Sequence, residues 1–222
     1  MKRRSSSVAA GFAVSAALLL TACGGSDRSS DNGKSVDGEH GTRTPQQTSV
    51  PSATSTEDEP DGVDLSLPKD MNLVFDWGKP KHADEAAAMN DAANFFRAIY
   101  RGVDRRTAKD AAVTAYSTGG GLKYAQTQIE AWIEGGWTAT GTLRHYDVTT
   151  RSAGNGTSVE VAFCADSSKF YGQEVETKKI LTTEPSIQDF DYYTVIMAKE
   201  PTSDGPWKAS KVFVDTKAEK CQ

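Results

Sequence analysis

Four residues in the C-terminal half of the chain could supply acid–base chemistry. His145, Tyr146 and Asp147 follow one another, and Asp166 lies further along. An imidazole or carboxylate base in an apolar pocket, facing a hydroxyl that steadies an oxyanion, can catalyse proton transfer. In a regular strand His145 and Asp147 would share one face, with Tyr146 on the other. These four are the catalytic candidates, although a His in a Thr-rich strand is more often structural and Asp166 also fits the end of a strand.

Other patterns that would indicate chemistry are missing from the sequence. The three histidines, His40, His82 and His145, are scattered, and no Cys spacing suits zinc. The glycine run 119–121 has no following Lys-Ser/Thr, so it does not match a phosphate-binding loop. No Gly-x-Ser-x-Gly motif marks an esterase nucleophile. We therefore expect no metal and no cofactor.

Aromatic side chains concentrate in the C-terminal half, and most of them must fill a core between helix and sheet. Tyr192 and Tyr193 add two hydroxyls to the catalytic candidates. Phe170 and Tyr171 are expected in a loop, where an exposed aromatic pair can serve recognition. Packing of this pair onto the core is the other interpretation.

Charge and composition narrow the class of partner. The chain has 222 residues and a formal net charge of −5 at pH 7, and much of the negative charge lies between residues 24 and 68. No basic patch with interleaved aromatics is present. This pattern excludes nucleic acid as the expected partner.

The first 22 residues have the pattern of a bacterial export signal. Basic residues at positions 2–4 precede an apolar stretch, 8–20, that is too short to span a bilayer as a permanent helix. The sequence Leu-Thr-Ala-Cys at 20–23 resembles the lipobox of bacterial lipoproteins, where a diacylglyceryl group is attached to the Cys. The resemblance implies that Cys23 is lipidated and anchors the protein on the extracytoplasmic face of the bacterial cell membrane. The export route, general secretory or twin-arginine, stays open.

A polar segment separates this anchor from the rest of the chain. Residues 24–68 are mainly Ser, Thr, Gly, Asp, Glu and Pro, and they cannot bury enough apolar surface to offset their ordering entropy. We expect a disordered stalk that holds the domain roughly 35–40 Å from the bilayer. The chain then divides into a signal peptide, 1–22, a lipidated Cys with its stalk, 23–68, and one domain, 69–222.

Two cysteines remain once Cys23 carries lipid. Cys164 and Cys221 form an even pair in an oxidising compartment, so we expect a disulfide between them. Two free thiols, one in a strand and one near the C-terminus, are the alternative.

Hydrophobic periodicity predicts three helices followed by a sheet. Helical spacing covers 84–100, 106–116 and about 122–133, with Asp104 as a candidate cap of the second helix and glycines 119–121 as a break. Alternating β-branched residues predict strands at 138–150, 158–165, 173–181, 187–198 and 207–215, with Gly141 placed to form a bulge. We expect an apolar segment, 71–77, to precede the first helix and to pack on the core. The predicted fold class is α+β with a strongly bent antiparallel sheet.

This element order, over residues 83–215, resembles the nuclear-transport-factor-2-like (cystatin-like) superfamily. In that fold a curved sheet wraps a long N-terminal helix into a cone with one open mouth. The Gly-Pro-Trp-Lys motif at 205–208 supports the resemblance. The sequences at 141–146 and 161–166, with the lipobox, are similar to lipoproteins of high-GC Gram-positive bacteria (actinobacteria). These resemblances imply a fold rather than an activity.

The combined expectation is a lipid-anchored module of the cell envelope that binds a protein partner or a small apolar ligand without catalysis. The alternative is a small cavity enzyme of the isomerase or dehydratase type, with an acid/base pair drawn from His145, Asp147 and Tyr146. Ketosteroid isomerase and scytalone dehydratase have this cone fold, but no sequence pattern aligns these residues with their catalytic positions. The resemblance also allows a homodimer through the open face of the sheet.

Overall fold

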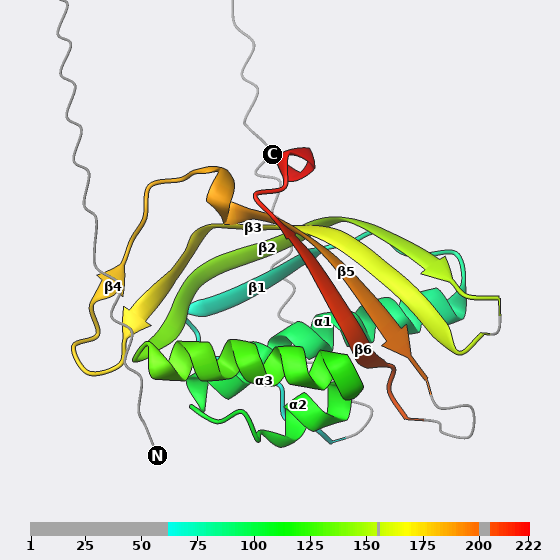
Figure 1. Ribbon diagram of the computed structural model, residues 1–222, viewed down its shortest axis with the longest axis horizontal. Helices are drawn as coiled ribbons and strands as arrows, with labels where there is room; N and C mark the ends of the chain where they lie inside the picture. The colour runs from blue at the N-terminus through cyan, green and yellow to red at the C-terminus, as the bar shows by residue number, and fades with distance from the viewer. Residues whose placement is uncertain (1–61, 155, 200–204) are drawn as a thin grey trace, which may run out of the picture. The chain divides into compact units, whose positions relative to one another are not determined.

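The structure, a computed structural model, describes residues 62–154, 156–199 and 205–222. The expected signal peptide 1–22, the lipidation residue Cys23 and the stalk as far as residue 61 lie outside the described residues. Within the described part, three α-helices and a six-stranded sheet form an α+β domain, which confirms the predicted fold class. The helices cover one face of the sheet, which arches over them (Figure 1).

The sheet is mixed, with the strand order β1-β2-β3-β5-β6 and β4 paired to β3. Its strands are β1 (Met71–Asp76), β2 (Trp137–Ser152), β3 (Ser158–Glu174), β4 (Ile180–Leu181), β5 (Phe190–Ala198) and β6 (Lys208–Thr216). β1 runs parallel to β2, and the other pairs are antiparallel. The expectation of a wholly antiparallel sheet is therefore wrong at one edge. The segment expected as a lead-in is a strand that hydrogen-bonds along β2.

β3 is longer than the sequence predicts. It runs unbroken over 17 residues, where two strands joined by a loop were expected. The extension forms because β2 pairs along its whole length, with Thr140 opposite Tyr171 and Thr138 opposite Gln173. Only the short β4 remains of the predicted strand at 173–181, and a 3-10 turn, η1 (Ile187–Asp189), precedes β5.

Gly141 allows β2 to bend against β3. Its φ of +97° lies in the region that favours glycine, and a Cβ there would lie 2.2 Å from the carbonyl oxygen of Lys169. The register irregularity expected at this glycine follows it directly, between Thr142 and Arg144. A second irregularity falls between Tyr146 and Thr149.

The helices follow the predicted order with shifted ends. α1 (Ala83–Asp104) runs beyond its predicted end at residue 100. α2 (Ala111–Tyr116) is shorter than predicted, because Asp110 rather than Asp104 caps it by accepting a hydrogen bond from the Ala112 N–H at 2.9 Å. The two differences arise together, since the chain between the helices forms a tight turn.

α3 (Gly119–Glu134) begins earlier than predicted, because the glycine run forms its first turn. This turn packs directly on β6. A Cβ at Gly121 would lie 2.0 Å from the carbonyl oxygen of Ala209, so the close approach requires a residue without a side chain. The Thr118 N–H donates to the same carbonyl at 2.9 Å. The expected break is thus the point where α3 docks on the sheet.

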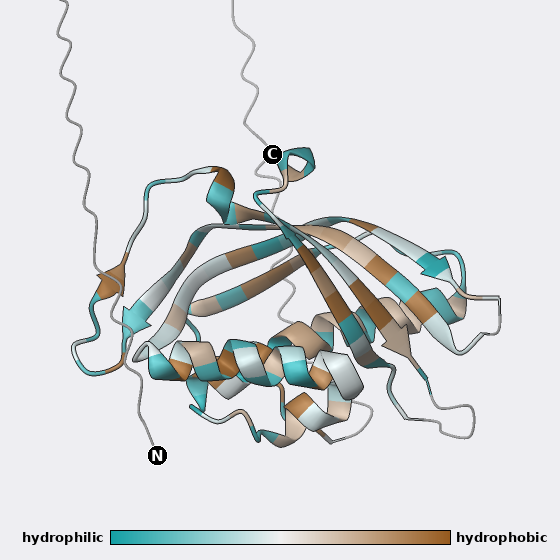
Figure 2. Cartoon of the chain, in the orientation of Figure 1, coloured by the Kyte–Doolittle hydropathy of each residue, from teal (hydrophilic) through white to brown (hydrophobic). Residues whose placement is uncertain are grey.

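The hydrophobic core lies between the helices and the inner face of the sheet. In Figure 2, hydrophobic and hydrophilic residues alternate along α3 and the strands, as expected where one face is buried. The buried face of α1 recurs at helical spacing and includes Ala88, Ala92, Phe95, Phe96, Ile99 and Val103. It packs against fully buried side chains that include Ile129, Phe163, Met197 and Trp207.

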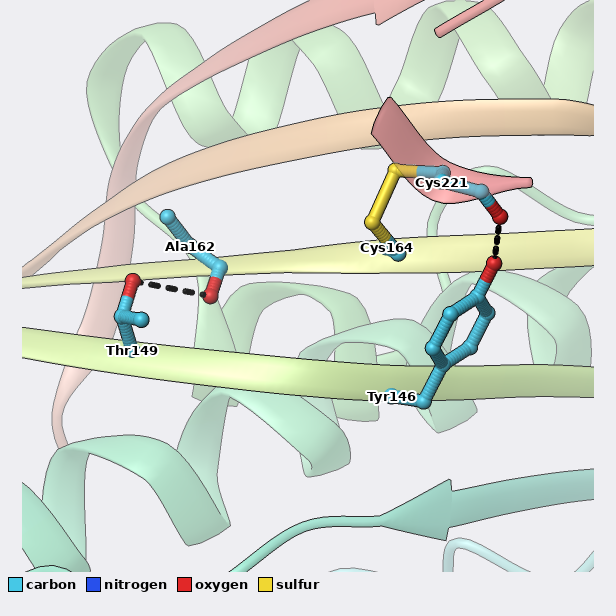
Figure 3. Close-up of a disulfide and its surroundings, with 5 residues drawn as sticks. All are labelled: Tyr146, Thr149, Ala162, Cys164 and Cys221. Atoms are coloured by element: carbon cyan, nitrogen blue, oxygen red, sulfur yellow. Dashed lines mark hydrogen bonds between the residues drawn. A yellow bond between two sulfur atoms is a disulfide. The ribbon is translucent and has the colours of Figure 1, made fainter. Parts of the chain in front are cut away.

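A disulfide joins Cys164 in β3 to Cys221 in the C-terminal turn η2 (Glu219–Cys221), which confirms the predicted pair. Both cysteines are buried, and the Tyr146 hydroxyl donates a hydrogen bond to the Cys221 carbonyl (Figure 3). In the same view Thr149 hydrogen-bonds to the Ala162 carbonyl across β2 and β3. The disulfide and the Tyr146 hydrogen bond fix the end of the chain to the sheet.

We expect loss of the disulfide to lower the free energy of unfolding by about 4 kcal/mol, because the bond closes a loop with a sequence separation of 57. Urea denaturation of the chain with and without a thiol reductant measures the change. The double variant Cys164→Ala/Cys221→Ala should match the reduced wild type and should not respond to reductant. An unchanged wild-type midpoint on reduction would contradict the expectation.

Candidate functional site

A cavity of about 250 Å³ lies between α1, α3 and the inner face of the sheet. Aromatic rings from both helices and from β3 and β5 form much of its wall. Polar side chains from β2, β5 and η1 complete it. The lining residues are Phe96, Tyr100, Gln128, Trp132, Leu143, His145, Ala165, Ser167, Phe170, Asp189, Asp191 and Tyr193. The cavity is therefore where chemistry-bearing side chains meet apolar surface.

His145 is the most deeply buried polar side chain of this cavity. It is fully buried, and its ring stacks on Phe75 with the centroids 4.4 Å apart. Phe96 and Phe163 lie at 5.4 Å and 5.5 Å from it, in tilted and edge-on arrangements. Aromatic packing therefore holds the imidazole in one orientation.

The hydrogen bonding of His145 determines which ring nitrogen carries the proton. Its Nδ1 lies 3.2 Å from the carbonyl oxygen of Val74. A carbonyl only accepts, so Nδ1 is the protonated nitrogen of the neutral ring. Nε2 is then a bare acceptor, and it is buried without a hydrogen-bond partner among the described residues. Burial, with a smaller effect from Arg97, lowers the pKa of His145 to about 4, so the ring is neutral at neutral pH.

Three tyrosine hydroxyls gather close to the cavity, from Tyr100 in α1, Tyr124 in α3 and Tyr193 in β5. The side chains of Tyr193 and Tyr124 are hydrogen-bonded to each other. Burial raises the pKa of all three phenols, and the charge of Asp191 raises them further. The hydroxyls therefore stay protonated at neutral pH and can form hydrogen bonds with a bound molecule.

Asp191 brings a carboxylate to the cavity wall. Burial raises the pKa of this carboxyl, and the like charges of Asp189 and Asp215 raise it further. A hydrogen bond from the Lys217 backbone acts in the opposite direction. Asp189 also lines the cavity, whereas no Lys or Arg does so among the described residues.

Of the predicted catalytic residues, the structure brings His145 and Tyr193 to the cavity. The expectation that His145 and Asp147 share a face is wrong, because the irregularity after Tyr146 interrupts the alternation of β2. Asp147 has a φ of +52° and is exposed. Tyr146 lies on the disulfide side, with Arg144 over its ring at 4.7 Å.

Asp166 is not among the cavity-lining residues. It sits within β3, between partners on β2 and β5, and its carboxylate accepts a hydrogen bond from the Ser168 N–H at 2.8 Å. The interpretation of Asp166 as the end of a strand is therefore wrong, since β3 continues past it. Of the predicted catalytic residues, His145 and Tyr193 remain as cavity groups.

The expected recognition loop of Phe170 and Tyr171 is part of β3. Phe170 lines the cavity and packs edge-on against Tyr100, with ring centroids 5.0 Å apart. The Tyr171 hydroxyl donates to the Ser168 carbonyl at 3.1 Å. Phe170 therefore follows the alternative interpretation, that of packing, but it packs at the wall of a cavity.

Sequence reasoning missed Asp191, Tyr100 and Tyr124. Asp191 and Tyr193 stand two residues apart in β5, so they share the inner face, and this spacing is a readable signal. Tyr100 ends the helical apolar pattern at 84–100, and that pattern by itself indicates packing rather than a site. Tyr124 carries no local signal, because its role depends on where α3 docks.

A second cavity, of about 290 Å³, has an almost wholly apolar lining. Its walls are Ala131, Trp132, Trp137, Gly172 and Leu181. Trp137 is 41% exposed, and Ile180, next to Leu181 in β4, is 45% exposed. This cavity holds no titratable group, so it cannot carry acid–base chemistry.

The described residues contain neither a candidate metal site nor a candidate membrane-spanning helix. No group of three or more His, Cys, Asp or Glu side chains there is arranged to hold a metal ion. No helix in the same ranges is long and apolar enough to cross a membrane.

Comparison with known proteins does not assign the chain to a family. No protein-family model matches it, and no curated protein matches it. Among solved structures, it is similar to the crystal structure of the intermembrane space region of the chloroplast protein ARC6. The TM-score is 0.40 at 11% identity, over 61% of this chain and 98% of that chain. A likeness this slight carries no argument about family or function.

We expect the buried His145 to make stability depend on pH. Its pKa is about 4 in the folded protein against 6.5 for an ordinary histidine, so the unfolded chain binds the proton first as the pH falls. The free energy of unfolding is unaffected by this group above pH 6.5 and falls by about 3 kcal/mol as the pH drops to 4. Urea denaturation at a series of pH values measures this slope.

The matched control is His145→Gln, which cannot titrate. The wild type should gain unfolding free energy relative to this variant as the pH rises from 4 to 6.5, because only the wild type has the titrating imidazole. An NMR titration that placed the pKa of the folded His145 near 6.5 would contradict the expectation.

Proposed function

We propose that the protein is a lipid-anchored binding module on the extracytoplasmic face of a bacterial membrane, and that it holds a small ligand in the cavity between α1, α3 and the sheet. The observation that carries the proposal is His145 Nε2, a fully buried acceptor with no described partner in the wall of a cavity. Buried polar groups are nearly always satisfied, so an unpaired one beside a cavity indicates an absent partner. A cavity with apolar walls and a few polar groups is the usual form of a small-molecule site.

The anchor in this proposal rests on the sequence. The basic start, the short apolar stretch and the Leu-Thr-Ala-Cys box at 20–23 together support lipidation of Cys23. The Cys164–Cys221 disulfide is consistent with an oxidising compartment outside the cytoplasm.

We also propose that the domain is a nuclear-transport-factor-2-like cone of the kind found in lipoproteins of high-GC Gram-positive bacteria. The 22-residue α1 packs along the inner face of a sheet that bends at Gly141, and this arrangement supports the proposal. The edge strand β1, parallel to β2, is an addition that the resemblance does not account for.

A small cavity enzyme is the second candidate function. Asp191, whose pKa burial raises, lies near three protonated tyrosine hydroxyls. A carboxylate base facing hydroxyl donors is the arrangement that proton-transfer catalysis needs. The acid/base pair would then be Asp191 with a tyrosine, in place of the pair first drawn from His145, Asp147 and Tyr146.

We expect Cys23→Ser to move the protein from the membrane fraction to the soluble fraction, because the lipid is attached to the Cys23 thiol. Fractionation of the expressing bacterium and labelling with a fatty acid measure anchor and lipid together. The double variant Cys164→Ser/Cys221→Ser is the control, since it removes the other two cysteine sulfurs without leaving an unpaired thiol and should leave the protein in the membrane fraction. A Cys23→Ser protein that stayed with the membrane would contradict the proposed anchor.

We expect the full chain, extracted from its host's membrane, to carry a small molecule that native mass spectrometry detects and that unfolding releases. Ala165→Leu should abolish this molecule, because Ala165 lines the polar cavity. Ala131→Leu adds the same bulk to the second cavity and should retain it. If Ala165→Leu fails to fold, Ser167→Leu places the bulk at a half-buried position of the same wall.

The outcomes separate the two functions. Wild-type protein free of any bound molecule, or loss of the molecule only in Ala131→Leu, would refute the proposed site. A recovered molecule that fresh protein leaves unchanged supports the binding module. Conversion of that molecule, abolished in Asp191→Asn while binding persists, would instead establish the enzyme.

A further inference from the structure

Three polar groups of the cavity wall only accept hydrogen bonds, whereas the Tyr100 and Tyr193 hydroxyls can also donate. His145 Nδ1 faces the Val74 carbonyl on β1, whereas Nε2, one ring carbon away, is buried and has no partner among the described residues. Because the ring is neutral with its proton on Nδ1, Nε2 can only accept. Asp189 and Asp191 add carboxylate oxygens, which also only accept when ionised. A ligand that satisfies these groups must therefore donate.

The charge of the cavity wall has one sign. Asp189 and Asp191 are its charged lining residues. Asp215 lies close enough to Asp191 to raise the pKa of its carboxyl. The neighbouring cation Arg97 is not a lining residue. It lies over the ring of Phe75 and donates to the neutral Asn94 side chain at 2.8 Å, and its charge still lowers the pKa of His145. Lys217 contributes its backbone N–H to Asp191. The wall therefore attracts a cation and repels an anion.

Aromatic faces and edges surround the same space. The rings are those of Phe96, Tyr100, Trp132, Phe170 and Tyr193. Tyr100 packs edge-on against both Trp132 and Phe170, so these three form a continuous aromatic wall. Aromatic rings attract ammonium groups through their quadrupoles, most strongly where water is excluded.

We infer that the ligand of this cavity is a small organic ammonium ion, with an N–H group that donates to His145 Nε2 or to a carboxylate and a flat apolar body against the aromatic rings. This inference rests on the proposed binding function and names the ligand class of that same cavity. A volume of about 250 Å³ has room for about eight groups the size of a water molecule, at roughly 30 Å³ each. The space therefore suits a small organic cation and exceeds what a single bare ion needs.

The test compares three probes of similar shape and different charge. Isothermal titration calorimetry of the full chain at neutral pH would use phenethylamine, phenethyl alcohol and phenylacetate. We expect phenethylamine to bind about tenfold more tightly than the alcohol, and the carboxylate to bind most weakly. Equal or tighter binding of the alcohol or the carboxylate would overturn the ammonium inference while leaving a ligand cavity in place.

Two variants test which carboxylate causes the preference for the amine over the alcohol. Asp191→Asn should reduce the amine-over-alcohol preference to less than about threefold, because it removes a carboxylate that lines the cavity. Asp215→Asn removes a neighbouring carboxylate outside the lining and should keep the preference. An amine preference unchanged in Asp191→Asn would overturn the role of the carboxylates.

A further comparison tests whether the ligand must donate a hydrogen bond. Phenethyltrimethylammonium keeps the charge and the ring but has no N–H, so it should bind more weakly than phenethylamine to the wild type. His145→Phe removes the acceptor and should narrow that difference. Failure of all probes to bind would overturn the ammonium inference. A molecule found by native mass spectrometry in the same cavity, lacking an amine, would overturn it while sustaining the proposed function.

Discussion

Aromatic packing between α1 and the sheet is the constraint on which the rest of the structure depends. Phe96 from the helix meets Phe163 and Tyr193 from neighbouring strands at centroid distances of 5.4 Å and 5.2 Å. The same cluster encloses His145 and holds it neutral. Rigid rings cannot fill every space between a helix and a bent sheet as flexible side chains would. The packing that fixes α1 on the sheet thus also leaves the cavity at its side, with an imidazole acceptor held in its wall.

The predictable part of the fold was local, and the unpredictable part depended on pairing partners. The helical spacing of apolar residues, and its change to strand-like alternation, locate α1, α3 and most strands, because each pattern reflects one buried face. The residues after Asp166 in β3 begin with Ser167 and Ser168, which are polar and small and indicate a turn when they are taken alone. Their strand conformation comes from the first half of β2, which hydrogen-bonds along them. The parallel placement of β1 has no local signal for the same reason.

The candidate site also combines residues with a local sequence signal and residues that only tertiary contacts bring together. His145 could be proposed from its residue type, and it does line the cavity. Its suggested partner Asp147 could not be excluded from sequence, because strand alternation assumes a regular β2 and a residue at φ +52° breaks that rule. Asp191 and Tyr193 form a visible alternating pair, yet only the docking of α3, set by the contact of Gly121 with Ala209, brings Tyr124 to them. Side chains from β2, β5 and α3 thus meet through contacts far from the site.

The disulfide also constrains how two copies of the chain can associate. It closes a covalent ring that contains β5 and β6, since it joins β3 to the turn after β6. β6 is an edge strand, and an edge strand is the element that two copies of a chain most readily exchange. While the ring is closed, β6 cannot leave its own sheet and extend to a neighbour without pulling on the middle of β3, where Cys164 lies. Strand exchange at this edge is therefore blocked in an oxidising compartment and becomes available only when the thiols are reduced.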